Sequence, residues 1–175
     1  MPLAKLLIAV LGAVGTAGPA AKPAEPPTRL DRYLVAETRR YRREAWRWQR
    51  LTGRARSPAG RGELEPSRAY REWVRNMWKR RAAQARRRAA NPPHERQWLC
   101  IHGHEGAWND PAPPYFGGLQ MDLAFQRAWG RELLARKGTA DNWTPLEQMW
   151  VAERAFRSGL GFTPWPNTAR MCGLL

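Results

Sequence analysis

Glu105 is the residue whose type and surroundings best suit it to acid–base chemistry. Several aromatic side chains lie near it in sequence, and no lysine or arginine occurs between Arg96 and Arg127. A carboxyl group in apolar surroundings without a cationic neighbour tends to hold its proton to higher pH, as a general acid near neutral pH requires. The alternative is an ordinary glutamate in solvent at the end of a helix, and composition alone favours it.

Cys100 and Cys172 are the two cysteines of the chain. An even pair in an exported protein usually forms a disulfide, and closing a loop of this length stabilises a fold by about 4 kcal/mol. A reduced pair in the cytosol is the alternative. Cys100, His102 and His104 also form a string of metal-ligand residue types. On a helix the two histidines point to different faces and no fourth ligand is suggested, so we predict neither a metal site nor a cofactor.

Charge is distributed unevenly along the chain. Residues 29–96 contain 21 Lys and Arg against 7 Asp and Glu, whereas residues 97–175 contain 7 of each kind. A chain of 175 residues suits one domain with appendages. We therefore predict a signal peptide at 1–20, a disordered linker at 21–29, a basic Arg/Trp-rich helical segment at 30–91 and a globular domain at 92–175.

The N-terminal residues have the pattern of a secretory signal. Lys5 precedes an apolar run at residues 6–14, and small residues follow the run. The run is shorter than the roughly 20 apolar residues that a membrane-spanning helix needs. We expect export with cleavage of this segment. Its retention as an N-terminal anchor is the alternative.

Two basic helices are predicted before the globular domain. The first spans residues 30–51 and has Leu34, Tyr41 and Trp48 at intervals of seven. The second runs from an N-cap at Ser67 to about Ala90. Its predicted apolar stripe contains Tyr70, Trp73, Val74, Met77, Trp78, Ala82, Ala85 and Ala89.

Helices that alternate Arg with Trp indicate contact with an anionic polymer or a membrane surface. The alternative is that the Trp stripes pack on each other or on the following domain, with the Arg side chains in solvent, and the two interpretations are compatible. We expect the two helices to form a basic helical hairpin. We expect no nucleic-acid partner, because a signal peptide is predicted and no groove-reading motif is present.

From Pro93 onward the pattern predicts a mainly α domain with a small β segment. We expect a short helix at 94–104, with Trp98, Ile101 and Glu105 on one face, and a strand-like segment at 115–122. Further helices are expected at 123–129, at 132–137 and from a capping box at Thr144 to Gly159. The remaining C-terminal residues are expected to form a loop.

This C-terminal part resembles the lysozyme-like catalytic domain of the resuscitation-promoting factors, a secreted actinobacterial group. The resemblance spans roughly residues 94–175. It rests on residue types in a specific order: Trp98, Cys100, Glu105, Trp108, Tyr115-Phe116-Gly117-Gly118-Leu119-Gln120, Glu147-Gln148, Val151-Ala152-Glu153-Arg154, Gly161, Trp165-Pro166 and Cys172. The family usually places a cysteine directly before the catalytic glutamate and Ser-Gly-Gly-Asn-Trp after it. Here Cys100 precedes Glu105 by a helical turn, and Gly-Ala-Trp follows.

The resemblance implies a lysozyme-like fold, peptidoglycan as the substrate and a secreted or cell wall-associated protein. Glu105 matches the catalytic acid, and Cys100 and Cys172 match the family's disulfide. Four further residues match positions in the substrate groove: Gln120, Asp122, Gln148 and Trp165. Because aromatic rings stack on the apolar faces of sugars, Trp108, Tyr115, Phe116 and Trp165 are candidates for that contact, although Trp more often belongs to a core.

Glycoside cleavage needs an acid for the leaving oxygen and usually a second carboxylate. Asp110 and Asp122 are the candidates, and a helix-capping role suits Asp122 better than catalysis. Two routes stay open. In a lytic transglycosylase, Glu105 acts as acid and then base while the sugar's own 6-hydroxyl attacks. In a muramidase-type hydrolase, Asp110 or Asp122 positions a water.

Three hypotheses for the function follow. The first is a secreted peptidoglycan-cleaving glycosidase that uses Glu105 as general acid, with the basic helices on anionic wall polymers or membrane. The second is a non-catalytic cell-wall or anionic-polymer binding protein on the same scaffold. The third is a cationic surface-active protein whose Arg/Trp helices act while the C-terminal domain is scaffold.

Overall fold

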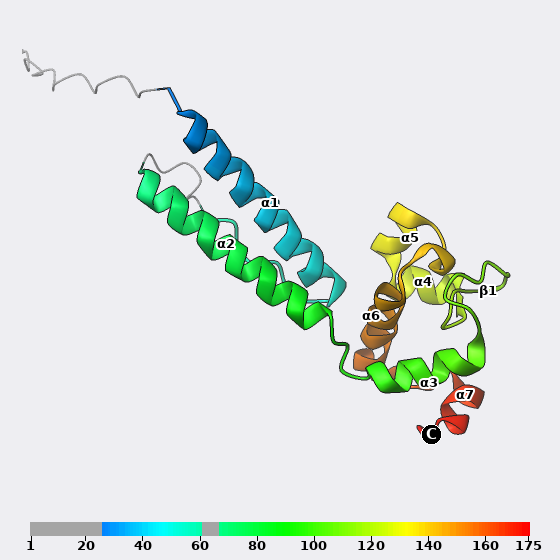
Figure 1. Cartoon of the computed structure of the whole chain (residues 1–175). Helices are drawn as coiled ribbons and strands as arrows, with labels where there is room; N and C mark the ends of the chain where they lie inside the picture. Colours follow the sequence, from blue (N-terminus) through cyan, green and yellow to red (C-terminus); the bar gives the residue numbers. More distant parts are fainter. Residues whose placement is uncertain (1–25, 61–66) are drawn as a thin grey trace, which may run out of the picture.

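The computed structural model describes residues 26–60 and 67–175. The predicted signal peptide and most of the predicted linker lie outside the described residues. The described chain is mainly helical with one small antiparallel sheet, which confirms this level of the predicted fold class (Figure 1). Its elements are α1 (Arg29–Leu51), α2 (Arg68–Ala89), α3 (Glu95–Glu105), β1 (Tyr115–Phe116), β2 (Met121–Asp122), α4 (Leu123–Trp129), α5 (Arg131–Lys137), η2 (Ala140–Asn142), α6 (Pro145–Ala155), η3 (Phe156–Leu160) and α7 (Pro166–Met171).

The two basic helices begin where their capping residues predict. Thr28 and Asp31 form a capping box at the start of α1, with each side chain bonded to the backbone N–H of the other residue. Ser67 accepts a hydrogen bond from the Tyr70 N–H and so caps α2, as predicted. These caps satisfy N–H groups that have no partner within the helix.

The two basic helices run parallel to each other, so the expected helical hairpin is wrong. Asp31 near the start of α1 forms an ion pair with Arg71 near the start of α2, and both helices run toward the C-terminal domain (Figure 1). The chain leaves α1 and turns back along it, because Ser57 is bonded to the Gln49 side chain and accepts from the Trp46 indole. A long connection permits this return, whereas a short one forces neighbouring helices antiparallel.

The apolar stripe of α2 is narrower than predicted. Val74, Trp78, Ala82 and Ala89 are buried, but Tyr70 and Trp73 are exposed. The first group lies on the side of α2 that faces α1, where Ala45 and the Trp46 ring pack on Trp78. A single partner helix covers only one side of α2, so large apolar residues beside that side stay in solvent.

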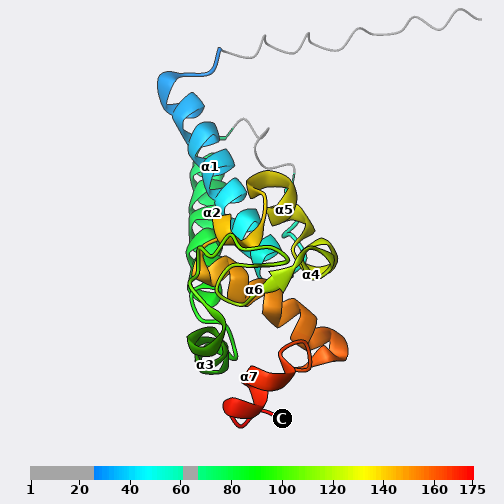
Figure 2. The same cartoon turned by 90° about the vertical axis from the view of Figure 1, so that its right-hand side faces the viewer.

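The C-terminal domain is built around α6, whose helical start is the predicted capping box of Thr144 and Glu147 (Figure 2). The core joins residues from α3, from β2 and the turn before it, from α5, from η2 and the residue after it, from α6, and from the C-terminal tail. It contains Trp98, Ile101, Leu119, Met121, Leu133, Ala140, Trp143, Met149, Val151, Ala152 and Trp165. Glu153 is also fully buried there, and it accepts hydrogen bonds from the His94 N–H and the Trp98 indole, both 2.8 Å long.

The ends of the helix pair pack on the C-terminal domain. The Trp150 indole donates to the Ala89 carbonyl over 2.7 Å, and Arg157 donates to the Thr52 carbonyl over 3.1 Å. Leu51, the last residue of α1, packs against the domain core. The predicted domain boundary near residue 91 therefore lies just after the segment in which the helix pair packs on the C-terminal domain. Among the described helices, none has the length and apolar character needed to cross a membrane.

The C-terminal residues contain a helix that the sequence analysis missed. Residues after Gly159 were expected to form a loop, but α7 spans Pro166–Met171, with proline in its first turn. Only six residues are helical, which is too short for an amphipathic pattern to identify. Burial of Thr168 and Ala169 against the domain stabilises this helix.

The ion pair between Lys137 and Glu147 gives a pH-dependent test of how α5 is held to α6. Burial favours the neutral carboxyl, but hydrogen bonds from Lys137, at 2.6 Å, and from Thr144 outweigh it and lower the pKa of Glu147. A carboxyl group whose pKa is lower in the folded state stabilises the fold fully at pH values above its ordinary pKa of 4.5. This stabilisation is lost as the pH falls through the lower pKa of the folded state. We expect Lys137→Met to cost about 1 kcal/mol in urea denaturation at pH 7 and much less at a pH below the lowered pKa of Glu147.

The matched control is Arg136→Met on the same helix. Arg136 pairs with Glu132 at 3.8 Å, and about half of each side chain is exposed, so its loss should cost little at either pH. A Lys137→Met penalty that is the same at both pH values would contradict the role given to this pair.

Candidate active site

Helix α3 positions Glu105 at the edge of the domain. Trp98 and Ile101 are fully buried and fix the helix, and Glu105 follows them on the same face as the last helical residue, half-buried. The Thr168 hydroxyl donates a 2.8 Å hydrogen bond to Oε1 of Glu105. Among the ion pairs of the described residues, none involves Glu105. The carboxyl group is therefore oriented by a neutral donor, with its other oxygen left for a reactant.

The disulfide between Cys100 and Cys172 is confirmed. It joins α3 to the residue that follows α7, across a Cα–Cα distance of 6.1 Å. Glu105 and Thr168 thus belong to two helices that the disulfide links covalently, about one helical turn from each of these residues. The sequence analysis did not identify Thr168, because it expected a loop there. Its position four residues before Cys172 was the available signal.

The loop after α3 brings Asp110 and Gln120 close to the residue that follows Glu105. Gln120 Nε2 donates to Asp110 Oδ2 over 3.0 Å and to the Gly117 carbonyl over 3.0 Å. A methyl group added at Gly106 would lie 3.2 Å from Gln120 Nε2 and 3.3 Å from Asp110 Oδ2. The structure therefore places two predicted site residues, Asp110 and Gln120, beside the end of α3.

Trp108 packs within the domain edge and is partly buried. Its indole stacks on the His102 ring with centroids 3.9 Å apart, and the His102 ring is bonded to the Gly118 carbonyl. The Trp108 carbonyl accepts a 2.7 Å hydrogen bond from Gln148. One face of this predicted sugar-stacking ring is therefore covered by protein.

Position 118 requires glycine because the His102 and Trp108 rings lie close to its backbone. This close approach gives a prediction about the stability of the fold. A Cβ there would lie 2.6 Å from His102 Nδ1 and 2.8 Å from Trp108 Cε3. We expect Gly118→Ala to lower the free energy of unfolding by about 2 kcal/mol in urea denaturation, because both rings must shift.

Gly103 provides the matched control for that substitution. It lies in α3, and a Cβ there meets no atom within 4 Å. Gly103→Ala should raise stability by about 0.5 to 1 kcal/mol, since alanine favours the helix. Equal effects of the two substitutions would show that the packing of His102 and Trp108 does not depend on Gly118.

Two predicted groove residues lie in the core. Gln148 is fully buried, and its side-chain amide donates to the carbonyls of Trp108, Ala140 and Trp143. Trp165 is 5% exposed, and its indole donates to the Leu119 carbonyl over 2.6 Å. Both side chains support the loop that carries Gln120, and neither offers a surface to a substrate in this structure.

Asp122 and Tyr115 face each other across the small sheet. Asp122 is exposed and caps α4 by accepting a 2.6 Å hydrogen bond from the Phe125 N–H, which confirms the capping role expected for it. Tyr115 is 51% exposed on β1. Of the aromatic residues proposed for sugar contact, Tyr115 has the most accessible ring, whereas Phe116 packs against the core.

Potential metal ligands also gather near the disulfide. Among the described residues, donor atoms of Cys100, His104 and Cys172 lie within 4.8 Å of one another. Both sulfur atoms are bonded to each other, so neither is a thiolate ligand in this oxidised chain. His102 is directed elsewhere, toward the Gly118 carbonyl.

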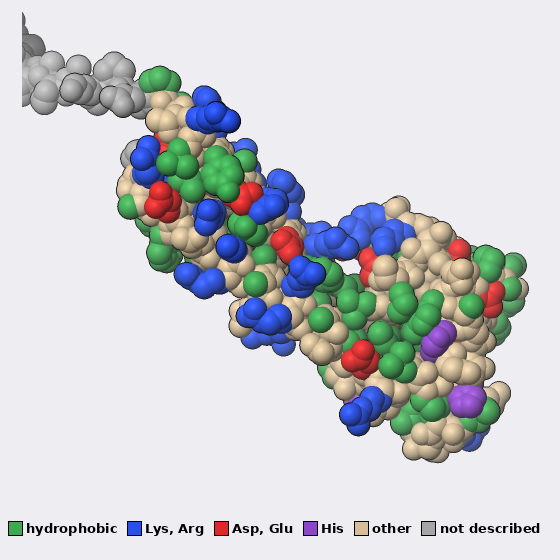
Figure 3. All heavy atoms as spheres, in the orientation of Figure 1, with side chains coloured by type: hydrophobic (Ala, Val, Ile, Leu, Met, Phe, Trp, Pro, Cys, Tyr) green, Lys and Arg blue, Asp and Glu red, His purple; other side chains and the backbone are tan. Residues whose placement is uncertain are grey.

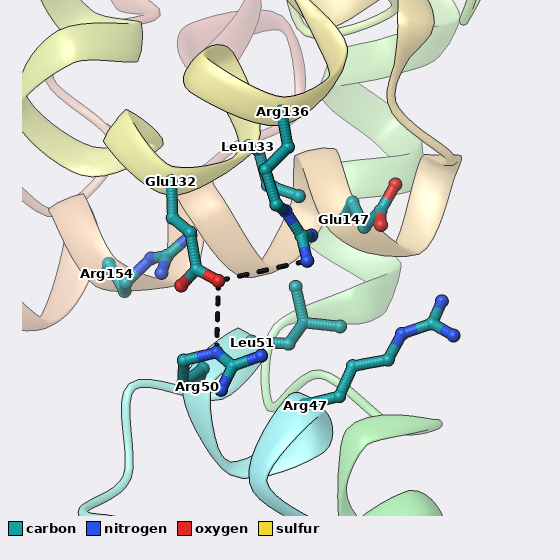
Figure 4. A pocket seen from close by; sticks show the side chains of 8 residues that line it. All are labelled: Arg47, Arg50, Leu51, Glu132, Leu133, Arg136, Glu147 and Arg154. Atoms are coloured by element: carbon teal, nitrogen blue, oxygen red, sulfur yellow. Dashed lines mark ion pairs between the residues drawn. The ribbon is translucent and has the colours of Figure 1, made fainter. Parts of the chain in front are cut away.

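A concave region lies at the joint between the helix pair and the domain (Figure 4). Glu132 of α5 lies between Arg50 of α1, at 3.0 Å, and Arg136. Burial lowers the pKa of the nearby Arg154 guanidinium, and the adjacent Arg157 adds to this effect. These arginines line the joint together with Arg47, so we assign this region to the packing of the two parts.

No known family model matches the chain, and neither a curated protein nor a solved structure shows significant similarity to it. The functional argument therefore rests on the residues and geometry described above.

Proposed function

We propose that this protein is a secreted peptidoglycan-cleaving glycosidase of lysozyme-like fold in which Glu105 is the general acid. The observation that carries the proposal is the Thr168–Glu105 hydrogen bond at the end of α3, beside Asp110 and Gln120. A carboxyl group oriented by one neutral donor has the second oxygen available for a glycosidic oxygen. The resemblance of residues 94–175 to the resuscitation-promoting factors supplies the substrate class.

In the first step of the proposed reaction, Glu105 gives its proton to the leaving glycosidic oxygen and becomes a carboxylate. Protonation breaks the bond between this oxygen and the anomeric carbon of one sugar. In a lytic transglycosylase, the 6-hydroxyl of that sugar attacks its own anomeric carbon and transfers its proton to Glu105. The acid is thereby regenerated, and a 1,6-anhydro sugar forms. This route needs no second carboxylate.

The hydrolytic alternative assigns the second carboxylate to Asp110. Its Oδ2 lies beside Gly106, whereas Asp122 is occupied by the cap of α4. Both Asp110 oxygens already accept hydrogen bonds, from the Ala112 N–H and from Gln120, each 3.0 Å long. These bonds fix the carboxylate, and each oxygen keeps a further lone pair that can accept from a water. We propose the transglycosylase route because it needs no second carboxylate.

Tyr115 is the proposed platform for a sugar ring, since it is exposed on β1 and lies on the segment that leads to Gln120. The basic helices are proposed to hold the enzyme on anionic polymers of the wall or on a membrane. Some of their arginines stack on aromatic rings, such as the exposed Arg47 on Trp48 at 5.0 Å, and basic side chains cover much of the helix pair in Figure 3.

The experiment is digestion of purified peptidoglycan by the oxidised chain without the predicted signal, with products resolved by mass spectrometry. We expect 1,6-anhydromuropeptides. Products with reducing ends would instead indicate hydrolysis, with Asp110 as the second carboxylate. Binding to the polymer without any release of product would overturn the enzymatic proposal in favour of a cell-wall binding protein.

A further inference from the structure

The end of the helix pair that lies away from the C-terminal domain carries a group of exposed large apolar side chains. They are Leu30 and Tyr33 of α1 and Tyr70 and Trp73 of α2, which are 40%, 50%, 41% and 52% exposed. The Asp31–Arg71 ion pair holds the starts of both helices together, so all four belong to one end, called here the distal end (Figure 1). They are four of the nine exposed large apolar residues described.

These side chains are not part of the contact between the helices. Tyr33 and Trp73 each precede a buried residue, Leu34 and Val74, by one position. One position turns a side chain about 100° around a helix, so both rings point away from the seam. The Tyr70 and Trp73 rings lie against each other, with centroids 5.5 Å apart. Solvent exposure of so much aromatic surface is costly and marks a binding surface.

The distal end is also cationic. Arg29, Arg32 and Arg68 are exposed there. The nearest acid, Asp31, is already engaged by the capping box of Thr28 and by Arg71. Basic side chains cover the length of the helix pair, and apolar side chains gather among them toward its free end (Figure 3). The surface therefore combines aromatic rings with exposed guanidinium groups, and among the described residues it also includes the exposed acid Glu72.

The combination of exposed apolar side chains with arginines favours one of the two anionic partners proposed above, a wall polymer and a membrane. Arginines can bind the anionic groups of a hydrated wall polymer and aromatic rings can stack on its sugars, but such a polymer offers nothing apolar to Leu30. The headgroup region of an anionic bilayer takes Trp and Tyr rings at the depth where Arg meets phosphate.

We infer that the distal end, formed by Leu30, Tyr33, Tyr70 and Trp73 with the surrounding arginines, is a docking surface for anionic phospholipid bilayers. The inference goes beyond the proposed glycosidase activity and does not require it. Where that activity holds, α2 with its 22 residues spans about 33 Å. Docking through the distal end then holds the C-terminal domain away from the lipid and toward the wall.

The test is co-sedimentation of the chain from Ala21 onward with vesicles of phosphatidylglycerol and phosphatidylcholine. All described helices and strands lie in this form, and it lacks the apolar run. We expect binding to mixed vesicles, little binding to phosphatidylcholine alone, and roughly a tenfold weaker partition for Tyr33→Ser/Trp73→Ser. The matched control is Leu99→Ser/Leu160→Ser, which removes apolar groups of 46% and 39% exposure from the C-terminal domain and should bind as wild type.

A second readout detects insertion directly. Brominated phosphatidylglycerol should quench part of the tryptophan fluorescence of the wild type, and Trp73→Phe, which keeps the apolar surface, should bind while losing that quenched fraction. Equal partition of the Tyr33→Ser/Trp73→Ser variant and the wild type would overturn the inference and leave binding to charge alone. Absence of vesicle binding by the wild type, with retained binding to anionic wall polymer, would overturn it in favour of the polymer.

Discussion

Replacing Glu105 with glutamine is expected to lower the rate of muropeptide release on the order of 10³-fold, the usual contribution of a general acid. Glutamine has the same shape, and its amide oxygen can still accept the hydrogen bond from Thr168. The variant loses only the proton that the leaving oxygen needs. Mass spectrometry of the digest measures the effect, and binding to insoluble peptidoglycan should be retained.

The control for this substitution is Glu72→Gln. It makes the same replacement of a glutamate by glutamine at an exposed position of α2 and should leave the rate unchanged. If Glu105→Gln releases products at the wild-type rate, Glu105 is not the acid and the assignment of the site fails. If it also fails to bind the polymer, the glutamate acts in recognition.

Removal of the disulfide is expected to have the largest effect on stability. The bond closes a loop between residues 72 positions apart, and the chain-entropy model gives about 4 kcal/mol for a loop of that length. For Cys100→Ser/Cys172→Ser we expect the melting temperature to fall by roughly 10 °C. Because the same bond holds α7 against α3, the Thr168–Glu105 contact should loosen, and activity should fall even well below the melting temperature.

Thermal denaturation and peptidoglycan digestion measure the two effects separately. Wild-type protein after reduction should behave like the double variant, whereas Glu105→Gln should lose activity with an unchanged melting temperature. A double variant that melts lower but digests at the full rate at low temperature would show that α7 does not position Glu105. An unchanged melting temperature would show that noncovalent packing alone holds the two helices together.

The sequence by itself determined the local structure of this protein. The cap residues Thr28, Ser67, Asp122 and Thr144 mark helix starts because a short polar side chain there satisfies free N–H groups, whatever the rest of the fold does. The same local logic placed Glu105 at a helix end behind Trp98 and Ile101. The pairing of Cys100 with Cys172 followed from the count alone, since the chain has no other cysteine.

Only the tertiary structure decided which sides of these elements are covered and which residues meet. Helical periodicity identifies apolar sides but not the partner that buries them, so it included Tyr70 and Trp73 in a stripe that α1 does not cover. It also could not show that α1 and α2 run parallel, because that depends on the path of a long connection. Gln148 is a core residue whose side-chain amide donates to the carbonyls of Trp143 and Ala140, five and eight residues before it, and of Trp108, 40 residues before it.

The partner of Glu105 is the clearest case of a feature that the fold alone supplies. Thr168 lies 63 residues further along the chain, in a helix too short to show a pattern, and reaches the carboxyl group because the disulfide and the buried Ala169 hold α7 in place. Local sequence determines conformation through neighbouring residues. A site assembled from distant segments depends on packing free energy that accumulates over the whole domain, and its geometry is decided there.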